Sequence, residues 1–313
     1  MSAVYLKTDH GEFAVPWVHG YVRFWNGPTS GPDGGSHRFP SGDPVNPLDW
    51  DLGNVPPGVA WGGIDEAGRG AWAGPVVAAC AVLDTDTVRR WRHVLLGVRD
   101  SKQLTPEKRE VLAAELKAIL PAYGIAEVDA MAIDRENILE ATMMAMRQAV
   151  KELSLRPRIL FIDGNRGPRT GLLERLVVDG DAISCAIGAA SILAKAHRDA
   201  LMIALEEQQP GYGFGQHKGY GTALHRARIA ELGVSPVHRI SYAPVAALQR
   251  VDEDLRDALH HSLDRCASVA ELQAWVVSDL RPVYGRLKLV WVETLRRRYA
   301  DRLAQFASVE GLE

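Results

Sequence analysis

The feature of this sequence that most constrains its fold is an alternation of short apolar runs with longer helical patterns, from Trp61 to about Arg250. The apolar runs are short, and the clearest of them is rich in β-branched residues, as strands are. The longer patterns repeat apolar residues at three- and four-residue spacing, and one of them starts with a cap and a first-turn proline, Thr105 and Pro106. Mixed strands and helices of this kind pack as layers. We therefore predict the α/β class.

The predicted elements of this region are easily read from the sequence. The expected strands are WGGID, PVVAACAVL and RILFID, and the expected helices are EKREVLAAELKAIL, NILEATMMAMRQAVKEL, ALHRARIAELG and the segment 182–208. The first half of the last segment is almost wholly small or apolar, which is typical of a helix buried against a sheet.

The segments that flank this region differ from it in composition. Residues 1–57 hold eight of the 29 glycines and eight of the 17 prolines, which indicates irregular chain. They also carry several aromatic residues, so they either dock on the main domain, form a small hairpin or remain disordered. We expect a protein without residues 1–56 to fold and stay active. After Arg250 the pattern is helical again, with a capping box at Ser268 and Glu271.

We therefore divide the chain into three parts. They are a Gly/Pro-rich N-terminal extension (1–57), a main domain (58–250) and a helical C-terminal extension (251–313).

Charge and cysteine content exclude several classes of protein. The formal net charge is −3, so no overall basic field marks a nucleic-acid binder, although an enzyme can hold a polyanion with a few local cations and metal ions. The three cysteines are widely spaced and give no disulfide framework or zinc site. The longest apolar run, 75–83, is too short to cross a bilayer, and the sequence does not start like a secretory signal. We expect a soluble cytoplasmic protein.

Acidic residues stand at the ends of the predicted strands. Asp65 and Glu66 follow one strand, Asp163 ends another, and Asp181 precedes the buried helix. Side chains at strand ends of an α/β sheet project beyond the packed interior, where sites gather. A single acid is more often a surface residue or a helix cap, but several converging carboxylates need cations. Hard oxygen ligands of this type favour Mg²⁺ or Mn²⁺.

An ordered set of motifs surrounds these acids. The motifs are GIDEAGRG, DSKQLTPEKRE, NILEATMMAMRQAV, LFIDGNR, GDAISCAIGAASILAKAHRD, HKGYGTALH and HRISYAPV. Together they resemble ribonuclease HII over approximately residues 61–245. The resemblance implies a ribonuclease-H-like mixed sheet flanked by helices, with residues 58–250 as the catalytic domain. It also implies a metal-dependent endonuclease that hydrolyses the RNA strand of RNA/DNA hybrids and single ribonucleotides embedded in duplex DNA. Two divalent ions, Mg²⁺ or Mn²⁺, would act, and cleavage would leave 3′-hydroxyl and 5′-phosphate ends.

The same resemblance implies which residues act. The catalytic and metal-binding acids would be Asp65, Glu66, Asp163 and Asp181. Asp199 is an alternative fourth acid, but we interpret it as the partner of Lys195 in an i,i+4 ion pair. Gly68, Arg69, Gly70 and Tyr220 would read the ribose 2′-hydroxyl at an RNA–DNA junction. Weaker candidates for phosphate contacts are Ser101, Lys102, Ser191, Lys195 and Lys218.

Three other functions are compatible with a fold of this kind. A non-catalytic nucleic-acid-binding or partner-docking protein could keep the fold, but it would gain nothing from carboxylates that face phosphates. A DNA nuclease of similar fold would not need a reader of the 2′-hydroxyl. Ribonuclease HIII typically has a lysine in the turn and a substantial N-terminal domain, whereas this sequence has Arg69 and a Gly/Pro-rich start.

Overall fold

The computed structural model describes residues 3–8, 11–18, 21–22, 46–98, 104–284, 287 and 289–310. The chain divides into two compact units. Unit 1 comprises residues 1–69, 76–128 and 138–198, and unit 2 comprises residues 70–75, 129–137 and 199–313.

Unit 1 is built on a mixed five-stranded sheet in the order β6-β5-β4-β7-β8. Its strands are β4 (Trp61–Ala67), β5 (Val76–Leu83), β6 (Ala122–Val128), β7 (Ile159–Asp163) and β8 (Leu173–Val177). The central strand β4 pairs antiparallel with β5 and parallel with β7, and β7 pairs parallel with β8. The carboxyl ends of β4, β7 and β8 therefore meet at one edge of the sheet.

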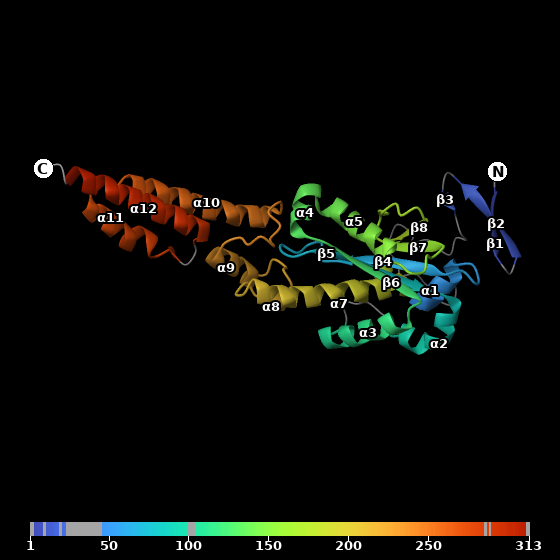
Figure 1. Ribbon diagram of the computed structural model, residues 1–313. Helices are drawn as coiled ribbons and strands as arrows, with labels where there is room; N and C mark the ends of the chain where they lie inside the picture. Colours follow the sequence, from blue (N-terminus) through green and yellow to red (C-terminus); the bar gives the residue numbers. More distant parts are fainter. Residues whose placement is uncertain are drawn as a thin grey trace, which may run out of the picture. The chain divides into compact units, whose positions relative to one another are not determined.

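Two helices cover opposite faces of this sheet (Figure 1). Helix α5 (Ile138–Lys151) packs Met146 and its neighbours against Ile64 and Leu160 in one buried cluster. Helix α7 (Cys185–Gln208) lies so close to the other face that a Cβ at Gly63 would be 2.0 Å from the carbonyl carbon of Ala186. Only glycine permits this approach.

The other helices of unit 1 are α1 (Pro47–Asn54), α2 (Thr85–Leu95), α3 (Pro106–Ile119) and α6 (Gly180–Ile183). Helix α3 begins at its predicted cap, where the Thr105 hydroxyl accepts a hydrogen bond from the Lys108 N–H at 3.4 Å. The single helix predicted for 182–208 is wrong at its start. Ser184 is extended and separates the short α6 from α7. Its backbone N–H closes α6 by donating to the Gly180 carbonyl, so the buried helix starts only at Cys185.

Helix α1 lies inside the segment that the sequence assigned to the N-terminal extension, yet it is part of the core of unit 1. Leu48 and Asp51 are fully buried. One oxygen of Asp51, Oδ2, accepts hydrogen bonds from Trp61 Nε1 at 3.1 Å and from the Ala186 N–H at 2.8 Å. These contacts tie α1 to β4 and to the start of α7. The expectation that residues 1–56 can be removed freely therefore conflicts with the structure.

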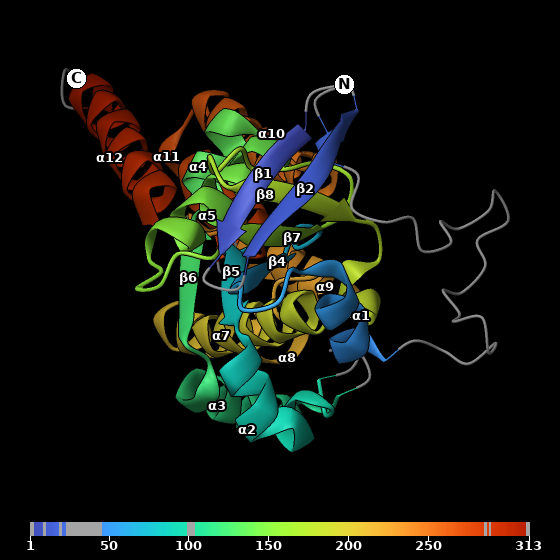
Figure 2. The ribbon, with the colours of Figure 1, turned by 90° about the vertical axis from the view of Figure 1, so that its right-hand side faces the viewer.

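Three short strands precede α1. They are β1 (Ala3–Thr8), β2 (Gly11–Val18) and β3 (Tyr21–Val22), and they form an antiparallel sheet in that order. Figure 2 shows β1 and β2 side by side. A hairpin was one of the arrangements that the sequence left open, and much of its Gly/Pro-rich stretch lies outside the described residues.

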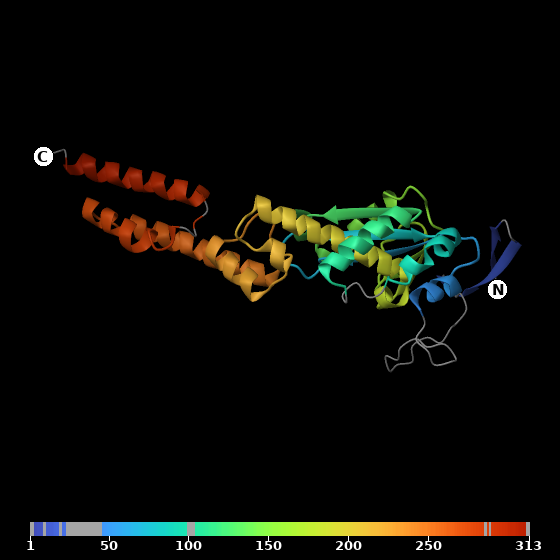
Figure 3. The same ribbon diagram turned by 90° about the horizontal axis from the view of Figure 1, so that it is seen from below.

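Unit 2 is helical. It contains the end of α7 and the helices α4 (Ala130–Glu136), α8 (Phe214–His217), α9 (Ala223–Leu232), α10 (Ala243–Asp264), α11 (Val269–Trp275), η2 (Val276–Leu280, a π-helix) and α12 (Leu289–Glu310). Helix α12 runs alongside α10 and α11 (Figure 3), with Leu263, Leu272 and Leu295 buried among them. The helical C-terminal region is confirmed, whereas the predicted boundary at residue 250 falls within α10 and stays a prediction.

No helix in the described part of the chain is both long and apolar enough to cross a lipid bilayer.

Candidate active site

The four predicted acids all belong to unit 1, and the sheet brings them to one edge. Asp65 and Glu66 stand near the end of β4, Asp163 is the last residue of β7, and Asp181 lies in α6, shortly after β8. Parallel pairing places Ile64 opposite Ile162. Asp65 and Asp163 are the next residues of these two strands, so they lie at the same end of the neighbouring strands β4 and β7.

Asp65 is the most buried acid of this group, and other negative charges surround it. Its Oδ1 accepts the Glu66 N–H at 2.7 Å, and the Ser191 hydroxyl of α7 also hydrogen-bonds to the carboxylate. Burial raises the pKa of Asp65 well above its usual range, and the charges of Glu66 and Asp163 raise it further. Without a cation, this carboxyl therefore tends to keep its proton.

Glu66 is coupled to the turn that follows β4. Its Oε1 accepts a hydrogen bond from Arg69 Nη1 at 3.2 Å. Burial raises the pKa of Glu66, the Arg69 charge partly offsets this, and the Asp163 charge raises it again. The half-exposed guanidinium of Arg69 thus balances part of the negative charge at the site.

Asp163 is joined to the segment that carries Asp181. Its Oδ1 accepts the Gly180 N–H at 2.7 Å, and a Cβ at Gly180 would lie 3.2 Å from that oxygen. Asp181, the next residue, is buried. The Asp163 side chain therefore joins the end of β7 to the backbone of Gly180, the residue directly before Asp181.

Buried carboxylates grouped in this way suit a hard divalent cation, because a cation offsets both the burial and the repulsion that raise the Asp65 pKa. Within the described residues, however, no three His, Cys, Asp or Glu side chains are already gathered at metal-ligand spacing. Asp65, Glu66 and Asp163 each direct one oxygen to a protein donor instead. The donor set fits a metal ion, and ion binding would require these side chains to turn.

The turn after the acids contains two glycines that differ physically. Gly68 has φ +92°, and a Cβ on it would lie 2.0 Å from Nε of the fully buried Arg198. At Gly70, an added Cβ would have no heavy atom within 4 Å, and φ is not positive. Gly68 is therefore required by the fold itself, whereas nothing in the described structure requires a glycine at position 70.

The loop that carries Tyr220 is held in unit 2 by the segment directly after this turn. The Trp72 N–H donates to the Gly219 carbonyl at 2.7 Å. A Cβ at Gly219 would lie 2.4 Å from the Ala73 carbonyl oxygen, and one at Gly221 would lie 2.2 Å from the Trp72 ring. Both neighbours of the exposed Tyr220 thus pack against residues 72–73. This contact brings Gly70, two residues before Trp72, near the loop.

Comparison with known proteins identifies this arrangement. A family model described as Ribonuclease HII matches residues 62–245. A Ribonuclease HII from Polaromonas sp. (strain JS666 / ATCC BAA-500) is 48% identical over 204 residues, which are 65% of this chain and 97% of that protein. The chain belongs to the ribonuclease HII family. It is therefore a type 2 ribonuclease H, an endonuclease.

Solved structures agree with this fold. The crystal structure of ribonuclease H2 from Pyrococcus horikoshii OT3 has a TM-score of 0.54 and 27% identity, and the match covers 61% of this chain and 98% of that one. A crystal structure of Bst-RNase HIII in complex with Mn²⁺ has a TM-score of 0.53 and 18% identity, over 70% of this chain and 78% of that one. The second likeness concerns the fold alone. The predicted ribonuclease-H-like mixed sheet is confirmed.

Asp199, the rival fourth acid, is buried in unit 2, whereas Asp181 is buried in unit 1 with the other three acids. The choice of Asp181 within this ribonuclease HII site stays a prediction, as does the pair of Lys195 with Asp199.

Three histidines of unit 2 stabilise the Tyr220 loop. His217 Nε2 donates to the Tyr212 carbonyl at 2.9 Å, because its Nδ1 accepts the Gly219 N–H at 3.1 Å. His225 Nδ1 lies 3.0 Å from the Tyr220 carbonyl, and its Nε2 lies 3.1 Å from Nε2 of His238. Burial lowers the pKa of His225 to about 4 and that of His238 to about 3. Both are neutral at pH 7, so they serve as packing and hydrogen-bonding groups.

The weaker substrate candidates are scattered. Ser101 and Lys102 lie outside the described residues. Ser191 hydrogen-bonds to Asp65, and its contact with a phosphate stays a prediction. Lys195 is half-buried on α7. The ammonium of Lys218 donates to the Gly215 carbonyl at 2.6 Å, which directs it to its own loop.

Sequence reasoning missed three residues that shape the ribonuclease HII site. They are Asp51, which links α1 to α7, Arg198, which fills the space above Gly68, and Trp72, which packs on Gly221. Arg198 gave a visible signal, since it is a cation near an almost wholly apolar helical stretch. Trp72, just after the glycine turn, gave a weaker one. Asp51 lies in a Gly/Pro-rich stretch, so its burial had no signal.

Proposed function

We propose that this ribonuclease HII family member cuts the RNA strand of RNA/DNA hybrids and cuts at single ribonucleotides embedded in duplex DNA, with Mg²⁺ or Mn²⁺ as cofactor. The products would carry 3′-hydroxyl and 5′-phosphate ends. The observation that supports this best is the burial of Asp65 beside Glu66 and Asp163 at one sheet edge, which raises the pKa of Asp65. Strongly shifted pKa values of this kind are concentrated at functional sites.

Asp65, Glu66, Asp163 and Asp181 are the residues that would hold a pair of divalent ions. Such ions, when bound, lower the pKa of water and stabilise negative charge on phosphate oxygens. The neutral histidines of unit 2 need not act as general bases.

The rest of the chain would keep the acids in place. The Glu66 N–H and Ser191 hold the Asp65 carboxylate, and the Gly180 N–H holds that of Asp163. These partners keep each side chain at the sheet edge, and the side chains would turn from them toward a bound ion. Arg69, half-exposed beside Glu66, would be available to a phosphate or a sugar at the edge of the site.

Selection of the ribonucleotide would fall to Gly68, Arg69, Gly70 and Tyr220. The packing of residues 72–73 on Gly219 and Gly221 supports the part of Gly70 and Tyr220, because it joins the segment that starts at Gly70 to the Tyr220 loop within unit 2. Tyr220 is exposed, and its phenol can donate or accept a hydrogen bond to a 2′-hydroxyl. Ser101, Lys102, Ser191, Lys195 and Lys218 would add weaker contacts to the strands.

The cellular role that follows is removal of ribonucleotides from DNA, a step of DNA repair in the cytoplasm. Ribonucleotide-containing duplex DNA and RNA/DNA hybrids are the partners that we propose.

One cleavage assay tests this proposal. Three duplexes of the same sequence would be compared: all DNA, DNA with one ribonucleotide, and a full RNA/DNA hybrid, each with Mg²⁺, Mn²⁺ or EDTA. We expect ion-dependent cleavage of the last two only. Cleavage of the all-DNA duplex would indicate a DNA nuclease, and binding without cleavage would indicate a non-catalytic protein.

A further inference from the structure

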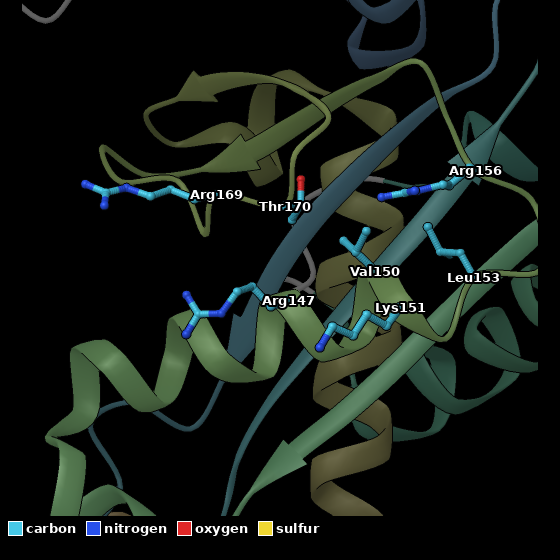
Figure 4. A pocket seen from close by; sticks show the side chains of 7 residues that line it. All are labelled: Arg147, Val150, Lys151, Leu153, Arg156, Arg169 and Thr170. Carbon is cyan, nitrogen blue, oxygen red and sulfur yellow. The ribbon is translucent and has the colours of Figure 1, made fainter.

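A pocket of unit 1 away from the acids gathers positive charge. Its volume is about 380 Å³. It is lined by Arg147, Val150, Lys151, Leu153, Arg156, Arg169 and Thr170. Figure 4 shows Arg147 and Lys151 on α5, and Arg169 and Thr170 on the loop that faces it. Four of its seven lining residues are cations, and none is an acid.

The pocket is separate from the proposed active site. Arg156 precedes β7 and Thr170 precedes β8, so both lie toward the amino ends of these parallel strands. Asp163 lies at the other end of β7, about 13 Å along a strand of this length. Helix α5 also covers the opposite face of the sheet from α7, which carries Ser191. A group bound in this pocket would therefore not be bound by the four acids.

The four cations of the pocket, Arg147, Lys151, Arg156 and Arg169, form no ion pairs among the described residues. The carboxylate of Glu174 lies behind the loop, where it accepts the Thr170 N–H at 2.5 Å, and Glu174 is not among the lining residues, so one negative charge stands near four positive ones. Cations gathered around one hollow repel one another, and an anion would relieve this repulsion.

The loop that faces α5 is held in a strained shape. Arg169 has φ +61°, in the left-handed region that a non-glycine residue rarely adopts. Glu174 stabilises it by accepting the N–H of Arg169 at 3.3 Å and the hydroxyl of Thr170 at 2.8 Å. A Cβ at Gly167 would lie 2.3 Å from the same carboxylate, so a larger residue there would displace the Glu174 side chain that holds the loop. Strain that the surroundings maintain is concentrated at binding and catalytic sites.

The two walls of the pocket are also joined to each other. Arg147 Nη1 donates to the Pro168 carbonyl at 3.1 Å, which links α5 to the loop. This bond fixes the guanidinium and leaves its other N–H groups for a ligand. The Thr170 hydroxyl is already used by Glu174, so recognition falls to the four cations.

The chemistry of the lining selects the kind of anion. Three of the four cations are arginines, whose planar forks match phosphate oxygens in pairs. The volume lies within the range of small-ligand pockets and exceeds what a bare phosphate needs. Val150 and Leu153 offer apolar surface for the rest of the ligand. We propose that this pocket binds the phosphate of a nucleotide, either free or at the end of a nucleic-acid strand.

Calorimetric titration of the full chain in EDTA tests this proposal. Without divalent ions the acids repel phosphate, so binding at the active site does not contribute, and the result does not depend on cleavage. The probes are adenosine 5′-monophosphate, adenosine, inorganic phosphate and a short 5′-phosphorylated oligothymidylate. We expect the monophosphate to bind at least about tenfold more tightly than adenosine, as charge-assisted hydrogen bonds require.

The decisive variant is Arg156→Gln/Arg169→Gln, which should weaken binding of the monophosphate by about tenfold or more. Its matched control is Arg90→Gln/Lys117→Gln, which removes the same charge from exposed positions of unit 1 and should bind like the wild type. Arg156→Gln alone is a second variant that leaves the strained loop intact. Binding of the oligonucleotide at the same site would identify a strand end, and its absence a free nucleotide.

Any of three results would overturn the proposal. The first is no binding of either phosphate ester by the wild type. The second is equal binding by the wild type and both pocket variants. The third is an equal loss in the control, which would indicate non-specific attraction.

Discussion

The carboxylate of Asp163 accepts a hydrogen bond from the backbone N–H of Gly180 at 2.7 Å. This single bond connects the end of β7 to the turn after β8 and places Asp181 next to an acid that comes from another strand. Because the donor is the backbone of Gly180, the bond depends on the path of the chain there and on the Asp163 side chain, but not on the side chain of Asp181. Two of the four proposed ligands are therefore positioned together.

The first prediction concerns the fourth acid. Asp163→Asn and Asp181→Asn should fold yet lose nearly all cleavage, because loss of a metal-binding carboxylate removes several kcal/mol of transition-state stabilisation. The amide of the Asp163→Asn variant keeps an oxygen for the Gly180 N–H. Asp199→Asn should keep substantial activity if it folds, and circular dichroism would check folding. An inactive, folded Asp199→Asn beside an active Asp181→Asn would reverse our assignment.

The second prediction concerns ion-free stability. Asp65→Asn removes a buried carboxyl that neighbouring charges disfavour, so it should raise the melting temperature in EDTA by about 2–4 °C, the shift that about 1 kcal/mol produces in a protein of this size. Added Mg²⁺ should stabilise the wild type more than this variant. The exposed Asp179→Asn serves as the matched control. Equal Mg²⁺ responses in all three proteins would argue against an ion at Asp65.

The third prediction compares the two glycines of the turn. Gly68→Ala should lower the free energy of unfolding by at least about 2 kcal/mol, since it has positive φ and its Cβ would overlap Arg198. Gly70→Ala should change stability by less than about 0.5 kcal/mol. Urea denaturation measures both. If Gly70→Ala is stable but cleaves poorly, glycine at 70 serves the approach of substrate; similar stability losses in both would contradict the geometry.

The fourth prediction concerns pH and Asp51. Burial raises the pKa of this carboxyl to about 7 from an ordinary value of 3.8. The folded state thus binds one more proton than the unfolded state between these values. The stability that this provides is complete below about 3.8, falls as pH rises and is lost above about 7.

Asp51→Asn cannot ionise, so it should lack this dependence. The free energy of unfolding of this variant minus that of the wild type should rise by up to about 4 kcal/mol between pH 3.8 and about pH 7. Urea denaturation across the pH range measures the difference. Parallel pH profiles for the two proteins would show that Asp51 does not titrate with folding.

The fifth prediction concerns Tyr220 as a reader of the 2′-hydroxyl. Tyr220→Phe removes only the phenolic hydroxyl, whereas Tyr220→Ala also removes the ring. If the hydroxyl is the main reader, both should slow single-turnover cleavage at one ribonucleotide by about 5- to 150-fold, the value of one good hydrogen bond. If the ring places the junction, Ala should be much worse than Phe. Dependence on Mg²⁺ should survive in both, and wild-type rates in the Ala variant would assign Tyr220 to packing.

Local sequence was enough to predict the class of fold and the elements that carry the acids. The runs that end in Asp65 and Asp163 became β4 and β7, and the cap at Thr105 and the capping box at Ser268 begin α3 and α11. These features depend on local preferences and periodicity, which neighbouring residues alone express. The motif order was likewise sufficient to identify the ribonuclease HII family.

The residues that support the site emerge only in the folded chain, because their contacts join segments far apart in the sequence. Asp51 meets Ala186 across 135 positions, and Gly68 is required by Arg198 on another element. The raised pKa of Asp65 likewise arises from burial and from Asp163 on a neighbouring strand. No local pattern encodes such a distance. Burial, close approach and charge coupling exist only once the sheet has aligned its strand ends.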